Sequence, residues 1–193
     1  MNRRKSTEWL KTIHKNVSDL YIVNNLFWQF QRVLQENERL TATNNVFFDW
    51  INALFSESIV MRVRREVDTG DDCVSTLQLL RHFRATPAVL AVRITEAELD
   101  ADIEALSRRR TDIADAAPAT VVRGYADRRV AHADPRGLQD GNPTFRQVNE
   151  CITHLCTLVN KYAEAACDEN LPILPPACGT GWKEVFTFPW IEQ

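Results

Sequence analysis

The sequence has few of the features that mark β-proteins, membrane spans or secreted proteins. Only 6 of its 193 residues are glycine, and several long stretches contain neither glycine nor proline, which favours helices. No apolar run approaches about 18 residues, so no transmembrane helix is expected. The basic start, MNRRKSTEWLKTIHKN, lacks the apolar region of a secretory signal, so we expect a cytoplasmic protein without a membrane partner. The net charge of −3 restricts any nucleic-acid-binding surface to a local patch.

The sequence also lacks the signs of a disulfide framework or a metal site. The cysteine count is odd and no C-x-x-C pair occurs, which favours reduced, buried thiols at Cys73, Cys151, Cys156, Cys167 and Cys178. His14, His82 and His154 have no partner at the spacing of a helical metal site, and no phosphate-binding loop motif is present. We therefore predict neither a metal nor a cofactor.

Two long helices are predicted in the first third of the chain. Apolar residues recur every three to four positions over residues 6–38, with polar interruptions at Asn24 and Gln31 and a bend expected near Asn24. The segment 43–67 is apolar on most sides. A helix that is apolar all round is typical of a buried position, so we expect this helix to be the central one.

The starts of three later helices are indicated by capping residues. Ser75 precedes a short leucine-rich helix as its N-cap. Thr95 with Glu98 and Thr144 with Gln147 have the spacing of capping boxes, which predicts helices to about residues 116 and 167.

Another helix carries TVVRGYADRRVAHAD at 120–134, after Pro118 interrupts the preceding pattern. The chain therefore predicts an all-α, up-and-down bundle of five to six helices over residues 1–168. Residues 169–193 are rich in proline and aromatic residues, so we expect an irregular C-terminal tail that packs on the bundle or on a second subunit.

The stretch YADRRVAHAD, residues 125–134, contains the strongest candidate for catalysis. In a regular helix Tyr125, Arg128 and His132 share one face, and Arg123 points to the opposite side. The helix dipole near the C-terminus favours a protonated His132, whereas the nearby Arg128 opposes it. The alternative is that His132 only interacts with the last carbonyl groups of its helix.

Two segments together resemble the HEPN superfamily, in its abortive-infection branch. One is the late helix with arginines followed by A-H-x-D at Ala131–Asp134, and the other is FSESIVMRVRREVDTGDDCVSTLQLLRHF at 55–83. In that branch a helix ends in a basic stretch and an Asp, and a Ser-initiated, leucine-rich helix follows. The similarity covers roughly residues 5–168 and leaves the tail unmatched.

The resemblance implies a metal-independent endoribonuclease of a phage-defence or toxin–antitoxin system. His132 is then the acid–base group, Arg128 or Arg129 supplies positive charge, and Asp127 stands where the family often has a polar residue. The expected partners are RNA, a second copy of the chain that completes a composite site, and an antitoxin protein.

One departure from the family pattern supports an alternative function. The family places an Arg, four to six residues and then the His, but Tyr125, Ala126 and Asp127 occupy those positions here. The alternative is a catalytically silent HEPN-like module that binds RNA, a nucleotide or a protein. A plain dimerising helical scaffold is a third hypothesis.

A basic cluster, RVRR at 62–65, ends the second predicted helix. Arg62, Arg64 and Arg65, together with Tyr125, are candidate RNA-binding residues beside His132. The alternative is that these arginines cap helix carbonyls and pair with Glu66 and Asp68.

Overall fold

A computed structural model describes residues 3–37, 46–70, 72–90, 93–107, 118–131, 142–166, 171 and 181–186. Over these residues the chain forms α-helices and short helical turns and no strand. The α-helices are α1 (Arg3–Glu36), α3 (Val46–Glu66), α4 (Thr76–Ala85), α5 (Glu96–Ser107), α6 (Pro118–Tyr125) and α7 (Phe145–Ala166). Short 3₁₀ turns are η1 (Pro87–Leu90) and η3 (Gly181–Phe186), and η2 (Ala126–Val130) is one turn of π-helix.

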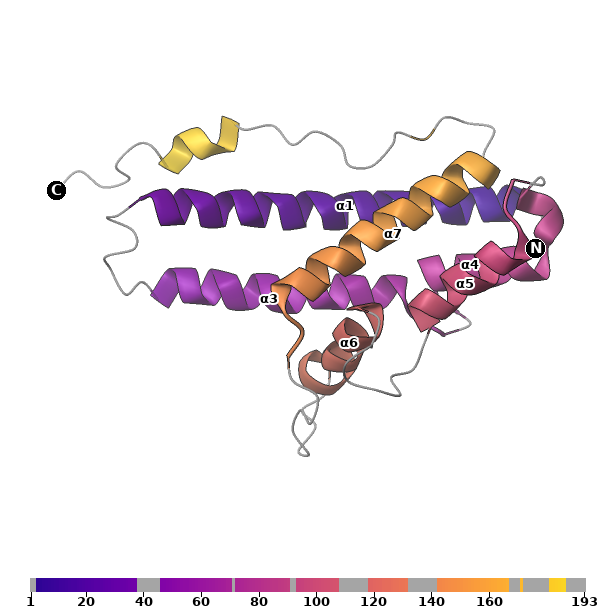
Figure 1. The fold of residues 1–193 in the computed structure, drawn as a ribbon. Helices are drawn as coiled ribbons and strands as arrows, with labels where there is room; N and C mark the ends of the chain where they lie inside the picture. The colour runs from indigo at the N-terminus through magenta and orange to yellow at the C-terminus, as the bar shows by residue number, and fades with distance from the viewer. Residues whose placement is uncertain are drawn as a thin grey trace.

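The helices form a bundle around a single apolar core, which confirms the predicted all-α class (Figure 1). The two long helices α1 and α3 lie side by side, and α7 crosses them obliquely. The helices α4 and α5 pack together at one end, while α6 packs against α3 and α7. This arrangement brings the end of α3 next to α6 and η2, where most of the predicted site residues are found.

The three predicted helix starts are confirmed by their capping hydrogen bonds. The Ser75 hydroxyl accepts the Gln78 N–H at 3.1 Å. Thr95 and Glu98 exchange backbone-to-side-chain hydrogen bonds at 2.9 and 3.2 Å. Thr144 and Gln147 do the same at 2.8 and 3.2 Å. Each cap satisfies backbone N–H groups that the first helical turn leaves without an acceptor.

The helix α3 is not the most buried one, so that prediction is wrong. Its first half exposes Val46, Phe47, Trp50 and Leu54, with exposed fractions from 44% to 76%. The helix α7 instead has a continuous buried face that runs from Val148 to Ala166. Burial follows from the neighbouring helices: α6 and α7 cover only the second half of α3.

The two polar interruptions in α1 are satisfied by neighbouring helices. Asn24 Nδ2 donates to Asn149 Oδ1 of α7 at 2.9 Å, and Gln31 Nε2 donates to Asn52 Oδ1 of α3 at 2.6 Å. The helix runs without interruption through Asn24, where a bend was predicted. These amide pairs fix the register of α1 against both neighbours.

Two boundaries differ from the predicted ones. Pro118 begins α6 as its first residue, a position where the missing N–H of proline costs no hydrogen bond. The helix α5 is described only to Ser107, and residues 108–117, which include the predicted helix end near residue 116, lie outside the described residues.

Part of the C-terminal tail packs on the bundle. The 3₁₀ turn η3 contacts α1 and lies along it in Figure 1. Most of the remaining tail residues lie outside the described residues, so the predicted division between 1–168 and 169–193 stays a prediction.

Candidate functional site

Arg64 near the end of α3 joins two carboxylates. Its Nε atom donates to Asp127 Oδ1 of η2 at 2.7 Å, and its Nη1 atom forms an ion pair with Asp68. The hydrogen bond to Asp127 is the largest of several effects that raise the pKa of Arg64 above its ordinary value. The predicted pairing with Asp68 is present, and the contact with Asp127 links two segments 63 residues apart in the chain.

Arg123 of α6 binds the same aspartate. Its Nε atom lies 3.7 Å from Asp127 Oδ2, and its Nη2 atom donates to Thr69 Oγ1 at 3.4 Å. Asp127 therefore faces one arginine at each carboxylate oxygen, with a hydrogen bond from Arg64 and an ion pair with Arg123. We call Arg64, Arg123, Asp68 and Asp127 the charged cluster; its two guanidinium groups and two carboxylates sum to no net charge.

The turn after α3 fixes the Asp68 side of the cluster. Asp68 Oδ1 accepts the Gly70 N–H at 2.9 Å, and Gln78 Nε2 donates to the carbonyl oxygens of Thr69 and Gly70 at 2.9 and 2.8 Å. Burial raises the pKa of Asp68, but the hydrogen bond from Gly70 and the charge of Arg64 outweigh it and lower the pKa below its ordinary value. Asp68 therefore stays ionised.

The predicted regular helix over 120–134 is wrong in its middle, because η2 is a π turn. The Ala131 N–H donates to the Ala126 carbonyl oxygen, five residues earlier, at 2.9 Å. A π turn holds one more residue than an α turn, so residues after it no longer share faces with earlier residues as in a regular helix. Single π turns are frequent at functional sites.

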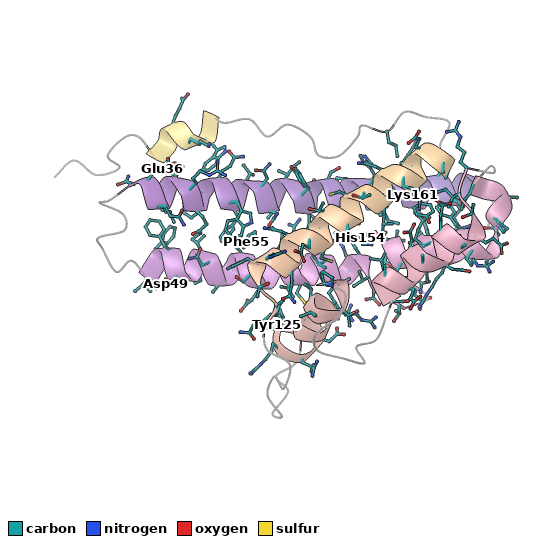
Figure 2. All side chains as sticks on the ribbon, viewed as in Figure 1. Glu36, Asp49, Phe55, Tyr125, His154 and Lys161 are labelled. Carbon is teal, nitrogen blue, oxygen red and sulfur yellow. The ribbon has the colours of Figure 1, made fainter. Side chains whose placement is uncertain are left out.

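Arg128 folds back along its own helix. Its Nε atom donates to the Gly124 carbonyl oxygen at 3.3 Å, and its Nη2 atom lies 3.2 Å from the place that a Cβ on Gly124 would take. The guanidinium thus lies against Gly124, at the end of α6. Arg129 is exposed, and Tyr125 is partly buried and packs against the apolar core beneath α7 (Figure 2).

His132 lies outside the described residues, and it directly follows Ala131, which closes the π turn.

The other two arginines of the RVRR stretch flank Arg64 in the sequence. Arg65 is half-exposed and lies 3.4 Å from Glu66, as the pairing alternative expected, and Arg62 is half-buried.

The sequence interpretation missed Arg123 as a member of the site. It placed Arg123 on the side opposite His132, on the assumption of a regular helix. Arg123 and Asp127 are four residues apart, which is the spacing of a helical ion pair, so this local signal was available. No local signal connects Asp127 with Arg64.

The two cysteines of α7 offer no activated thiol. Burial raises the pKa of Cys151 to about 12 and that of Cys156 to about 11. Both thiols are buried in α7 and stay protonated, and Cys73 is half-buried. Cys167 and Cys178 lie outside the described residues.

Within the part of the chain that the structure describes, no group of three or more His, Cys, Asp or Glu side chains is placed to hold a metal ion. None of the described helices is both long and apolar enough to span a membrane.

One family model matches the chain. It is the AbiU2 model of HEPN proteins (HEPN_AbiU2), and the match covers residues 5–170. The matched range includes the whole charged cluster, the π turn and His132. No curated protein and no solved structure matches the chain.

Proposed function

The chain belongs to the AbiU2 family of HEPN proteins, and we propose that it is a metal-independent endoribonuclease of a phage-defence or toxin–antitoxin system. The observation that carries the proposal is the meeting of Arg64 and Arg123 on Asp127. That meeting point lies inside the π turn, which ends two residues before His132. Two positively charged groups are thereby held at the turn that precedes the candidate acid–base residue in the chain.

The reaction needs little more than these groups. A base removes the proton from a ribose 2′-OH, the oxygen attacks the adjacent phosphorus, and an acid protonates the departing 5′-oxygen. The products are a 2′,3′-cyclic phosphate and a free 5′-OH. His132 supplies the base and acid, and arginine supplies positive charge where the phosphorane-like transition state gathers negative charge.

We assign the charge-supplying role to Arg64 and Arg123 and a positioning role to Asp127. Asp127 holds both guanidinium groups in place, so it does not itself exchange protons with RNA. Arg128, predicted for the charge role, donates to a carbonyl of its own helix and ranks behind Arg64.

The remaining predicted residues lie around the cluster. Arg65 and Arg129 are exposed, and Arg62 and Tyr125 are partly buried. We propose that these residues contact the RNA backbone and an unpaired base. Such contacts bind RNA without taking part in the reaction.

The proposal includes a homodimer, because one His in each chain then provides both a base and an acid in a composite site. An antitoxin protein is the further partner proposed for a chain of this branch. The chemistry supports the homodimer, and the resemblance to the abortive-infection branch supports the antitoxin.

The test compares the wild-type protein with a His132→Ala variant. Growth arrest on expression and cleavage of total RNA in the presence of EDTA are measured for both. Cleavage by the wild type that survives EDTA and is lost in the variant is expected. Circular dichroism and the measured mass in solution check that the variant keeps the fold and the assembly. Equal cleavage by both proteins would contradict the proposal.

One observation favours the second candidate, a catalytically silent module that binds RNA, a nucleotide or a protein. The charged cluster has no net charge, since Asp68 and Asp127 neutralise both of its arginines. If the chain is a silent module that binds RNA, neither the wild type nor the His132→Ala variant cleaves RNA, and both bind it with equal affinity in a filter-binding assay.

A further inference from the structure

An open groove lies between α1 and α7, on different elements from the charged cluster. It encloses about 650 Å³ between Trp28 of α1 and the first half of α7, and it is lined there by Phe145, Asn149, Glu150 and His154 among others. Figure 2 shows His154 on α7 and Tyr125 on α6, at separate places on the bundle. We call this hollow the α1–α7 groove.

Two aromatic rings form the apolar part of the groove. The ring centroids of Trp28 and Phe145 lie 5.4 Å apart, edge to face at 81°. Phe145 is 44% exposed, although its ring also packs on Phe27. An exposed aromatic ring at the edge of a hollow is a platform on which a planar ligand can stack.

Asn149 supplies a directed polar group. Its Oδ1 atom accepts two hydrogen bonds, from Asn24 Nδ2 at 2.9 Å and from Trp28 Nε1 at 3.2 Å. These two donors use both lone pairs of the oxygen and fix the orientation of the amide. The Nδ2 group of Asn149 is thereby left to donate to a ligand in the groove that the residue lines.

His154 is a second polar residue of the groove lining, and one of its ring nitrogens makes no hydrogen bond within the described residues. Its Nε2 atom is shielded from solvent and has no hydrogen-bond partner within the part of the chain that the structure describes. Burial lowers the pKa of His154, and this effect exceeds the opposite effect of the negative charge on Asp102, so the ring is neutral near pH 7.

The groove also carries no net charge. Arg146 and Glu150, which line it, pair with each other at 2.8 Å. A phosphate group or another strong anion is therefore not the main recognised feature. The lining selects an uncharged, flat ligand whose edge presents a hydrogen-bond acceptor.

We propose that the α1–α7 groove binds a nucleobase, stacked on Phe145 and Trp28 and read at an acceptor edge by Asn149 Nδ2. A base of an RNA strand and the base of a free nucleotide share this chemistry. The RNA source rests on the proposed ribonuclease function, since the groove then holds an unpaired base of the substrate; the free-nucleotide source does not.

The test measures binding of AMP, GMP, CMP and UMP to the full chain by titration calorimetry, with ribose 5-phosphate as the ligand that lacks a base. At least one nucleotide is expected to bind and ribose 5-phosphate is not. The affinity is expected to change little between about 50 and about 200 mM salt, because base stacking releases no counterions. Failure of all four nucleotides to bind overturns the proposal.

Two variants locate the binding site. Asn149→Asp keeps an acceptor for Asn24 and Trp28 but removes the Nδ2 donor, and Phe145→Ala removes the stacking ring. Each is expected to weaken nucleotide binding about tenfold, a typical loss for one base contact. Phe47→Ala is the matched control: Phe47 is a 54% exposed phenylalanine on α3 with aromatic neighbours, outside the groove lining. Equal weakening by Phe47→Ala, or none by either groove variant, overturns the assignment.

Two further measurements are needed. The first distinguishes RNA from a free nucleotide as the source of the base, and the second distinguishes the groove proposal from the ribonuclease proposal. An unstructured oligoribonucleotide that competes with the nucleotide identifies RNA as a source, and a nucleotide that binds without such competition identifies a free nucleotide. The His132→Ala variant is expected to bind nucleotide as the wild type does, so a loss of cleavage alone leaves the groove proposal intact.

Discussion

The charged cluster and the α1–α7 groove are both polar, but they differ in how far their polar groups are already satisfied. In the cluster, Arg64 and Arg123 have carboxylate partners, and their side chains are 34% and 28% exposed. In the groove, the Asn149 amide nitrogen is left for a ligand, and the shielded His154 Nε2 has no hydrogen-bond partner within the described residues. Partly exposed ion pairs contribute only about 0–1 kcal/mol each to stability. In the proposed functions, RNA phosphate therefore has to compete with Asp127 for the arginines of the cluster, whereas a base bound in the groove displaces no protein hydrogen bond of Asn149.

The largest effect expected from this comparison follows the removal of Arg64. Arg64→Ala is expected to lower the rate of RNA cleavage by about 10²–10³-fold, the usual loss when one transition-state donor is removed. Single-turnover cleavage of a defined RNA measures it. Arg84→Ala is the matched control, because Arg84 of α4 also binds two carboxylates, Glu96 and Asp100. Equal losses in both variants would show that the cluster has no special role.

A smaller effect is expected when Asp127 is replaced, and it strengthens RNA binding while it slows RNA cleavage. Asp127→Asn keeps one oxygen acceptor for Arg64 but removes the charge that neutralises the arginines. We expect RNA to bind more tightly, with a salt dependence steeper by about one phosphate contact, while cleavage slows about tenfold because Arg123 loses its anchor. Filter binding across a salt series and a cleavage assay measure the two quantities. A variant that changes neither rules out Asp127 as the positioning residue.

Glu66, the last residue of α3, is a fully buried carboxylate and offers a contrast with the partly exposed carboxylates of the cluster. A substitution there measures how much the burial of its charge lowers stability. Burial raises the pKa of Glu66, and the hydrogen bond from Thr76 Oγ1 at 3.0 Å offsets only part of this. Because the folded pKa exceeds the unfolded one, the carboxylate costs stability as pH rises from the unfolded pKa through the folded pKa. Glu66→Gln keeps an acceptor for Thr76 and is expected to raise the free energy of unfolding at pH 7 by about 1 kcal/mol.

Urea unfolding of the wild type and Glu66→Gln, at mildly acidic and at neutral pH, measures this effect. The advantage of the variant is expected to shrink toward acidic pH, where Glu66 of the wild type is protonated. An advantage that stays constant with pH would show that the ionisation of Glu66 is not its cause.

The smallest effect is expected at Gly124. Gly124→Ala is expected to stabilise α6 by about 0.5 kcal/mol through better helix propensity. The new Cβ lies 3.2 Å from Arg128 Nη2, the end of a flexible side chain that can move by a few tenths of an ångström. Thermal unfolding measures the gain, and RNA cleavage is expected to stay unchanged. A clear drop in cleavage would return the charge-supplying role to Arg128.

The parts of the fold that the sequence predicted correctly depend on contacts between near neighbours. The capping pairs Thr95 with Glu98 and Thr144 with Gln147 span three residues, so their geometry follows from local spacing. The exposure of the first half of α3 depends on where α6 and α7 lie, and no local pattern contains that information.

The candidate site shows the same limit. The stretch 125–134 was singled out from its residues, although residues 132–134 lie outside the described ones, and Asp127 and Arg64 were both named as candidates. Their contact joins residues 63 positions apart, and the partners of Asn149 in the groove lie more than 120 positions away. The π turn is also invisible to a pattern that assumes one helical period, so the predicted sharing of faces along residues 120–134 does not carry through it.

The second half of α1 and the first half of α3 form the end of the bundle away from α4 and α5, and this has a consequence for local unfolding. There the two helices extend past α4, α5 and α6 (Figure 1). Phe47 and Trp50 of α3 are exposed at this end. Segments with few buried apolar contacts open locally at a lower free energy than the core. Backbone amides of Val46–Trp50 should therefore exchange with deuterium well before those of Ile152–Tyr162 in α7, and this end of the bundle should unzip while the rest stays folded.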